Sequence, residues 1–194
     1  GVQLASGTLR DSVVTRCLHK LFGAGVRMGA GTRVIGCTIT GSGGLSIVGN
    51  PIHTLTGFEI SGANENTGDI YVSGTDLRVR HARALGDATV YLNGSRLGGG
   101  GVRFYTAGTY ANDFYIDGHG PRRGENTAPD YGCLVFSGAA EVTLTGTAAF
   151  DVGDDGITLD IASGVKVVNN LEYLGSGAIR LIGAGTFYDK KAGK

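Results

Sequence analysis

One segment with the same order of residue types occurs three times in this 194-residue chain. Each copy has a leucine, a glycine-rich turn, an apolar-Arg-apolar strand pattern and a closing Gly-Thr pair, and successive copies lie 77 residues apart. Self-similarity at a fixed spacing is typical of stacked repeat architectures. The pattern predicts that the apolar neighbours of Arg27, Arg103 and Arg180 face the core. It also predicts that these arginines line one side of the molecule, about three coils apart.

Glycine contributes 36 residues and proline only 3. Glycine therefore lies far above its usual share of about 7%, and it stands between short apolar runs, where tight turns need it. Seventeen basic and seventeen acidic residues balance, which argues against a nucleic-acid partner. No apolar run approaches the roughly 20 residues of a membrane-spanning helix. We therefore expect neither nucleic-acid binding nor membrane insertion.

The three cysteines, Cys17, Cys37 and Cys133, form no Cys-x-x-Cys pair, and the chain has no His-Glu-x-x-His segment. Both absences argue against a zinc site. We expect buried, reduced thiols and no cofactor.

Residues 8–22 have the pattern of one amphipathic helix, capped by Thr8 and ended by Gly23. Fourteen segments of about five residues follow between residues 33 and 188, with the period-2 alternation of strands. No crossover helices separate them, which rules out a doubly wound α/β fold. The pattern predicts an all-β domain over residues 1–194, in which the helix caps coils spanning residues 23–194.

Two all-β architectures fit such segments. A sandwich or up-and-down barrel would use hairpins, and Asn93-Gly94 and Asp117-Gly118 match hairpin turns in part. A right-handed parallel β-helix would stack coils of roughly 25 residues, so that three coils fill the 77-residue spacing. We favour the β-helix, in which Asn169 and Asn170 would join internal asparagine stacks. The third repeat is cut short at Lys194. We therefore expect either that the domain ends near this residue or that the sequence is a piece of a longer chain.

The predicted helix and the stretch Gly25-Val-Arg-Met-Gly-Ala-Gly-Thr-Arg-Val-Ile-Gly-Cys-Thr-Ile-Thr-Gly41 resemble the opening of pectate-lyase-like β-helix proteins. The superfamily includes many phage tail spikes and extracellular polysaccharide-degrading enzymes. The resemblance implies a tail-spike or tail-fibre protein of the virion, or an extracellular protein. It also implies a homotrimer that binds bacterial cell-surface polysaccharide. Because this fold carries lyases, hydrolases and non-catalytic binders alike, it does not decide between binding and catalysis.

The segment Gly153-Asp154-Asp155-Gly156-Ile157 resembles the paired-aspartate segment of polygalacturonases, and Gly118-His119-Gly120 resembles their Gly-His-Gly segment, although His119 precedes the pair here. In that family two carboxylates act as acid and base on a glycosidic bond. The alternative is that Asp154 and Asp155 are turn residues.

Alternation places Asp151, Thr158 and Asp160 on the outer face, close to Asp154 and Asp155 in the sequence. Several carboxylates so close together can raise the pKa of one of them, which then acts as a general acid, or can bind Ca²⁺. The alternative is an ordinary solvated surface.

Residues 118–131 form the longest polar interruption and predict a loop inserted into a coil. Its candidates for binding an acidic sugar or for proton transfer are His119, Arg122, Arg123, Glu125 and Asp130. The alternatives are an ordinary surface insertion and a subunit contact.

Four tyrosines stand between apolar, inward-facing neighbours and are expected to point outward: Tyr71, Tyr91, Tyr105 and Tyr115. The same outward alternation includes Glu59, Arg78, Arg80 and Arg103. Tyrosine rings suit sugar faces and protein interfaces equally well.

These observations leave three hypotheses. The first is a virion-associated β-helix that binds polysaccharide, with the four tyrosines and Arg103 among its binding residues. The second is a polysaccharide lyase or glycoside hydrolase that uses Asp151, Asp154, Asp155 or Asp160 with His119. The third is a purely structural oligomerisation module.

Overall fold

The computed structural model describes residues 2–15, 26–28, 33–35, 37–40, 45–48, 58–66, 68–73, 76–93, 100–116, 133–150, 157–174 and 178–190. Within these ranges the regular structure consists of short β-strands without any helix, and the strand pairs are parallel. The part of the chain that the structure describes is therefore all-β with parallel sheets, as the sequence predicted. Pairing by hairpins, the sandwich alternative, does not describe these ranges.

Two sheets of eight strands run the length of the molecule. Sheet A contains β1 (Val2–Leu4), β4 (Val26–Met28), β7 (Leu45–Val48), β10 (Ile70–Ser73), β12 (Val90–Asn93), β15 (Phe114–Ile116), β18 (Thr147–Phe150) and β21 (Glu172–Leu174). Sheet B contains β2 (Thr8–Arg10), β5 (Arg33–Ile35), β8 (Phe58–Ser61), β11 (Asp76–Val79), β13 (Gly101–Phe104), β16 (Leu134–Phe136), β19 (Ile157–Ile161) and β22 (Ile179–Gly183).

A third side is divided between two smaller sheets. Sheet C contains β3 (Val13–Thr15), β6 (Thr38–Thr40) and β9 (Glu65–Asn66). Sheet D contains β14 (Gly108–Tyr110), β17 (Glu141–Leu144), β20 (Lys166–Asn169) and β23 (Thr186–Asp189). Between the two sheets, a turn over residues 81–87 occupies the place of the missing strand.

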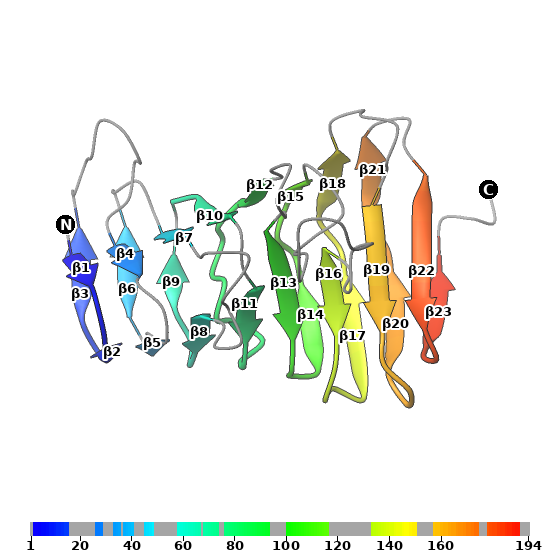
Figure 1. Cartoon of the computed structure of the whole chain (residues 1–194), viewed down its shortest axis with the longest axis horizontal. Coiled ribbons are helices and arrows are strands. Elements are labelled where there is room, and N and C mark those ends of the chain that lie inside the picture. The colour runs from blue at the N-terminus through cyan, green and yellow to red at the C-terminus, as the bar shows by residue number, and fades with distance from the viewer. Residues whose placement is uncertain are drawn as a thin grey trace, which may run out of the picture.

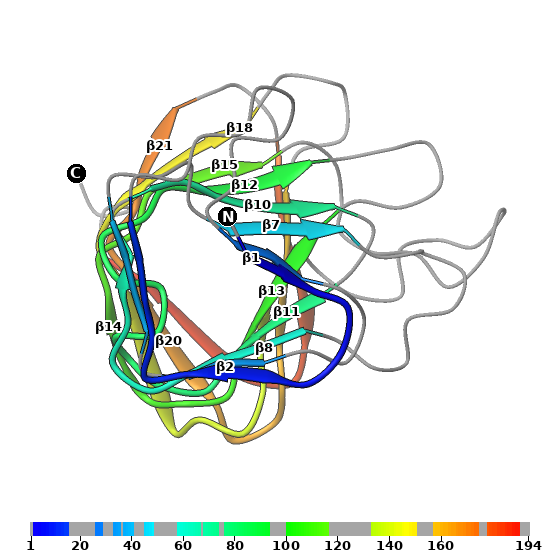
Figure 2. The same cartoon turned by 90° about the vertical axis from the view of Figure 1, so that its left-hand side faces the viewer.

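The strands enter the three sides in rotation, so each side gains one strand per coil, except in the coil of β10 and β11, where the turn over residues 81–87 takes the place of the third strand. Figure 1 shows the strands side by side along the long axis, from β1 at the blue end to β22 and β23 at the red end. Figure 2 looks along that axis and shows the three sides around one interior. Paired residues of sheet A are 24 residues apart at Val2 and Val26, 19 at Val26 and Leu45, and 34 at Phe114 and Ala148. The longest coil contains the predicted insertion at 118–131, which lies outside the described residues.

Inward-facing side chains from successive coils stack into one apolar core. The rings of Phe104 and Phe136 lie 5.1 Å apart and nearly parallel, and Tyr110 meets Phe104 edge-on. Buried asparagines join coils on the third side, as Asn64 and Asn112 donate their side-chain amides to carbonyls of the 81–88 segment. Asn169 is buried too, but its amide donates to Asp189 instead of another asparagine.

The predicted helix over residues 8–22 is wrong for the part that the structure describes. Thr8–Arg10 and Val13–Thr15 are strands β2 and β3, which pair with β5 and β6 as the first coil. Asp11 turns the corner between them with φ of 47°. Val13 is exposed and Val14 buried, so the apolar residues follow the two-residue period of a strand. Residues 16–22 of the predicted helix lie outside the described residues.

The 77-residue repeat is not a structural repeat. Arg27 belongs to β4 of sheet A, whereas Arg103 and Arg180 belong to β13 and β22 of sheet B. Even these two are out of register, because Arg103 is in line with Val135 and Asp160, while Arg180 pairs with Thr158. The three arginines therefore do not share one side. A glycine turn followed by an apolar-x-apolar strand fits any side of a coil, so its recurrence does not fix a period.

The apolar neighbours of these arginines behave in two ways. Val26, Met28, Val102 and Phe104 are buried, as predicted. Ile179 and Leu181 are 38% and 48% exposed, because β22 is the outermost strand of sheet B and no described coil covers it. Cys37 and Cys133 are buried and not disulfide-bonded, which agrees with the expected reduced thiols, and Cys17 lies outside the described residues.

Candidate functional site

Three of the four tyrosines singled out from the sequence come together on the outer face of sheet A. Tyr71, Tyr91 and Tyr115 occupy the same position of β10, β12 and β15. Their ring centroids are 4.9 Å apart at each step, with 16° and 9° between the ring planes. We call these residues the tyrosine stack. Its spacing matches the roughly 4.7–4.9 Å between neighbouring strands, so the backbone register itself holds the rings in contact.

Two of the three phenol groups, those of Tyr71 and Tyr91, have raised pKa values, which favours their neutral form. Tyr71 donates its hydroxyl to Asp69 Oδ2 at 3.1 Å. Burial raises the pKa of Tyr71, and the hydrogen bond to Asp69 and the charge of that carboxylate raise it further. Burial and Asp69 also raise the pKa of Tyr91. The stack thus combines uncharged flat rings with hydroxyl groups at their edges, which suits both apolar and hydrogen-bonding contacts.

A second outward row runs beside the tyrosine stack, two residues earlier on each strand. The register places Asp69, Thr89, Asp113, Thr147 and Glu172 in this row, which we call the acidic row. Asp113 Oδ1 accepts a hydrogen bond from the backbone N–H of Thr147 at 2.8 Å, which fixes the carboxylate against the next coil. Three of the five positions carry a carboxylate, so the field beside the rings is negative.

A short sequence pattern indicates this row, but it does not follow the 77-residue repeat. Asp69-Ile-Tyr71, Thr89-Val-Tyr91 and Asp113-Phe-Tyr115 share the order polar, apolar, tyrosine. Because alternate residues of a strand share one face, the order alone puts each polar side chain beside its tyrosine. The spacing varies from coil to coil, which hides the recurrence from a search at a fixed period.

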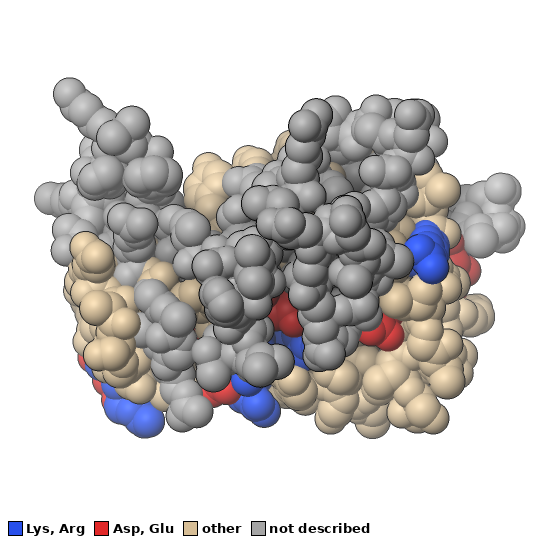
Figure 3. All heavy atoms as spheres, viewed as in Figure 1, with Lys and Arg blue, Asp and Glu red and all other residues tan. Residues whose placement is uncertain are grey.

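The fourth tyrosine, Tyr105, lies apart from the stack, next to sheet B. The Arg80 guanidinium lies 4.4 Å from the centre of its ring and also forms an ion pair with Glu59 at 2.6 Å. Arg103 is bound by Asp76 at 3.0 Å. These outward side chains of sheet B satisfy one another. Figure 3 likewise shows basic and acidic described residues close together on the visible face, without a large patch of one sign.

Asp160 is the one predicted catalytic residue that the structure describes. It points outward from β19, in line with Arg103 two coils earlier. Burial raises the pKa of Asp160, and the charge of Arg103 partly opposes that rise. Thr158, predicted on a solvated outer face, is buried even though it alternates with core residues. This side of sheet B is therefore less open to solvent than alternation alone suggests.

The remaining predicted site residues lie outside the described residues. They are the catalytic candidates Asp151, Asp154, Asp155 and His119, and the binding candidates Arg122, Arg123, Glu125 and Asp130. Their roles stay predictions.

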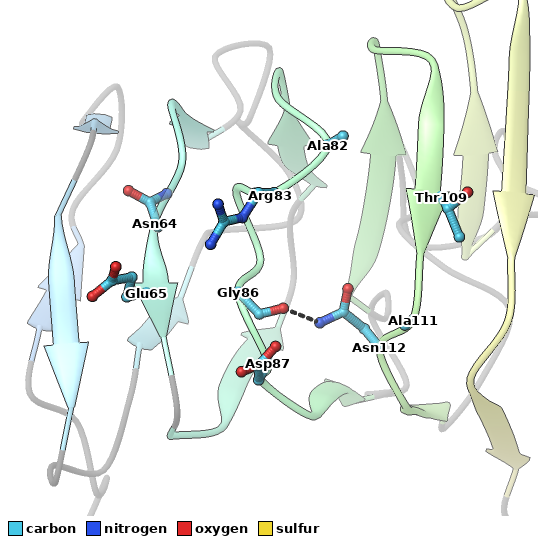
Figure 4. Close-up of a pocket in the computed structure, with 9 residues that line it drawn as sticks. All are labelled: Asn64, Glu65, Ala82, Arg83, Gly86, Asp87, Thr109, Ala111 and Asn112. Carbon is cyan, nitrogen blue, oxygen red and sulfur yellow. Dashed lines mark hydrogen bonds between the residues drawn. The ribbon is translucent and has the colours of Figure 1, made fainter.

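A hollow of about 220 Å³ lies on the third side, where the turn over residues 81–87 replaces a strand. Figure 4 shows that its lining comes from three neighbouring coils, with the amide of Asn112 directed at the carbonyl of Gly86. Glu65, Arg83 and Asp87 are its exposed charged residues. Ligand pockets usually measure roughly 300–1,000 Å³, and the asparagines here bind backbone groups. We therefore interpret the hollow as a consequence of the missing strand and not as a ligand pocket.

Within the described ranges no group of three or more His, Cys, Asp or Glu side chains is arranged to hold a metal ion. The same ranges contain no helix long and apolar enough to cross a bilayer.

Comparisons with known proteins identify no relative of this chain. No protein-family model matches the chain, and no curated protein or solved structure does so either. Function is therefore inferred from the geometry of the two outward rows of sheet A.

Proposed function

We propose that this protein is a right-handed parallel β-helix that binds a glycan on the outer face of sheet A. The fold part is supported by the regular rotation of strands through three sides. Seen from the N-terminal end in Figure 2, the blue trace runs clockwise from β1 to β2 along the bottom of the view and then up its left side. That sense matches the right-handedness of nearly all parallel crossover connections.

The observation that carries the binding function is the tyrosine stack. The three rings stack face to face in register, so the stack presents ring edges and, at Tyr115, which is 49% exposed, one ring face in an orientation that needs no rearrangement to meet a ligand. Aromatic rings pack against the C–H face of a sugar, and their hydroxyl groups can pair with its hydroxyls. The acidic row beside the rings adds acceptors for sugar hydroxyls. No other outward surface in the described ranges combines stacked aromatic rings with a row of carboxylates and hydroxyls.

Bacterial cell-surface polysaccharide is the glycan class that we propose, in keeping with the resemblance to tail-spike and tail-fibre proteins. The same resemblance motivates a virion or extracellular location and a homotrimer. The balanced charge of the chain and the paired charges of sheet B favour a glycan over a nucleic acid as the partner.

Binding to an array of purified bacterial capsule and O-antigen polysaccharides tests this function. We expect the wild-type protein to retain a subset of these glycans and Tyr115→Ala to lose at least about tenfold in affinity, or about 1.4 kcal/mol. Tyr188→Ala, which removes an exposed tyrosine of the last coil, is the matched control and should bind as wild type. A wild-type protein that retains no glycan on the array refutes the function.

A glycan-cleaving activity is the second candidate, and Asp160 is the observation that favours it. A carboxyl whose pKa is raised by burial is suited to act as a general acid. Release of reducing ends or of unsaturated uronates from the bound glycans would reveal it. Loss of that release in Asp160→Asn would assign the acid, whereas unchanged release would exclude Asp160.

A structural module that only forms oligomers is the third candidate. Sedimentation of the intact chain distinguishes it from the others, since a trimer without glycan binding supports it. A monomer contradicts both this candidate and the trimeric spike.

A further inference from the structure

The tyrosine stack ends at a small residue. Next to Tyr115 in the outer row stands Ala149 of β18, and the next position is Leu174 of β21. The exposed fractions of Tyr115 and Leu174 are 49% and 51%. We call the space over Ala149, between these two side chains, the Ala149 slot.

The width of the slot follows from the strand spacing. Tyr115 and Leu174 are two strands apart, which corresponds to roughly 9.5 Å. The rings of the stack follow one another at 4.9 Å, so one more ring-sized group fits above Ala149 at the same spacing. Such a group would meet the outer face of Tyr115 on one side and the aliphatic Leu174 on the other.

The polar groups beside the slot define what kind of ring it takes. Thr147 lies two residues before Ala149 and belongs to the acidic row. Its neighbours in that row are Asp113, which directly precedes β15, and Glu172 of β21. The hydrogen bond from Thr147 N–H to Asp113 Oδ1 holds that carboxylate in place. Two acceptors and a hydroxyl along one edge of a flat, apolar slot are complementary to a ring with an apolar face and hydroxyl groups on its rim.

The charge of this edge selects between classes of sugar. Asp113 and Glu172 are exposed carboxylates, and Asp69 adds a third to the same row. A uronic acid would bring a like charge to these groups, which costs binding free energy at neutral pH. A neutral pyranose brings only hydroxyls, which donate to the carboxylates.

We propose that the Ala149 slot binds one neutral pyranose unit of the glycan, stacked on Tyr115 and hydrogen-bonded along Asp113, Thr147 and Glu172. The inference rests on the proposed function and adds to it the position of a subsite and the class of sugar. It departs from the acidic sugar that the arginines of the 118–131 segment suggested.

Filling the slot tests the position. Ala149→Phe extends the ladder by one ring, so the variant should unfold at the same or a higher temperature than wild type. It should nonetheless bind the probe glycans at least about tenfold more weakly. The probes are chitotriose, maltotriose and cellotriose, observed by saturation-transfer NMR, together with any polysaccharide retained on the array. Ala140→Phe, at an exposed position just before β17, is the control for adding an aromatic ring elsewhere and should bind as wild type.

Replacing the carboxylates tests the class of sugar. Trigalacturonate is the charged counterpart of the neutral probes, and at low ionic strength we expect it to bind at least about threefold more weakly than the best neutral trisaccharide. The double variant Asp113→Asn with Glu172→Gln should remove that difference, because amides accept hydrogen bonds without the like charge.

The outcomes separate this inference from the function beneath it. Wild-type binding that survives in Ala149→Phe overturns the slot while leaving glycan binding by this protein intact. Preferential binding of trigalacturonate overturns the choice of a neutral sugar. Absence of any glycan binding overturns both. If Ala149→Phe instead abolishes an oligomer without altering glycan binding, a side chain of a second copy occupies the slot and the proposal is wrong.

Discussion

The ring of Tyr115 stacks on the ring of Tyr91 with 4.9 Å between centroids and 9° between planes, and its other face looks onto Ala149. One face of Tyr115 therefore stabilises the coil below, while no ring of the stack covers the other, and the side chain is 49% exposed. Tyr91 differs, since it has a ring on both sides. Under the proposed function, the same residue type thus has a structural role in the middle of the stack and a binding role at its end.

Tyr91→Leu should destabilise the protein more than Tyr115→Leu. The first change removes two ring contacts and the second removes one, and such contacts contribute about 0.5–1.5 kcal/mol each. We expect losses of about 1–3 kcal/mol and about 0.5–1.5 kcal/mol in the free energy of unfolding, measured by urea denaturation. Equal losses would show that the stacking contributes little beyond the burial of each side chain.

Gly86→Ala should be among the most damaging small substitutions. Gly86 has φ of +61°, and a Cβ atom there would lie 2.4 Å from the backbone nitrogen of Asn66. Gly164 also has a positive φ, of +79°, but a Cβ atom would meet nothing within 4 Å. Gly164→Ala should therefore cost about 1–2 kcal/mol from the backbone conformation alone.

Gly86→Ala adds a clash with the neighbouring coil to that conformational cost, so its midpoint of thermal unfolding should fall well below that of Gly164→Ala. Similar midpoints for the two variants would mean that the turn over residues 81–87 moves away without cost. The packing of this turn against β9 would then be unimportant for stability.

Alkaline pH should weaken the fold through Tyr110. Burial raises the pKa of Tyr110 from 10.0 to about 12, so the native state keeps this proton over a range in which the unfolded chain has lost it. The associated stability is fully present below pH 10 and is lost as the pH rises to 12. The total is about 2–3 kcal/mol.

Urea denaturation at several pH values between 9 and 12 measures that loss. Tyr110→Phe, which also removes the hydrogen bond to the Thr106 carbonyl, should show a shallower decline with pH. Tyr188→Phe, on the exposed last coil, should keep the wild-type slope. Burial also raises the pKa of the Cys133 thiol to about 11, so a residual decline with pH remains in Tyr110→Phe.

Arg103→Met should raise the pKa of Asp160 further. Burial raises this pKa and the Arg103 charge lowers it, so removal of the charge leaves burial unopposed. A raised carboxyl pKa stabilises the fold at acid pH, and that contribution disappears as the pH rises through the native pKa. Carbon-13 NMR titration of the Asp160 carboxyl measures the change directly. Arg80→Met, whose guanidinium pairs with Glu59, should leave the Asp160 titration unchanged.

The strands and their inward faces follow from local sequence. Phe114 and Ile116 alternate with Tyr115, and alternation of this kind fixes which side of a strand is buried because successive side chains point in opposite directions. The same reasoning fails over residues 8–15, since a short apolar run fits a helix and a strand alike. There the pairing with β5 and β6 decides the matter.

The sequence by itself determined an all-β chain of short coils and the outward direction of the four tyrosines. Only the tertiary structure decided which of them meet. Contact between Tyr71, Tyr91 and Tyr115 depends on a register set by coils of unequal length, and the same register places Tyr105 elsewhere and Ala149 at the open end of the stack. Coil length is fixed by how each turn closes and packs on its neighbours, and that information is distributed over the whole coil instead of residing in any local motif.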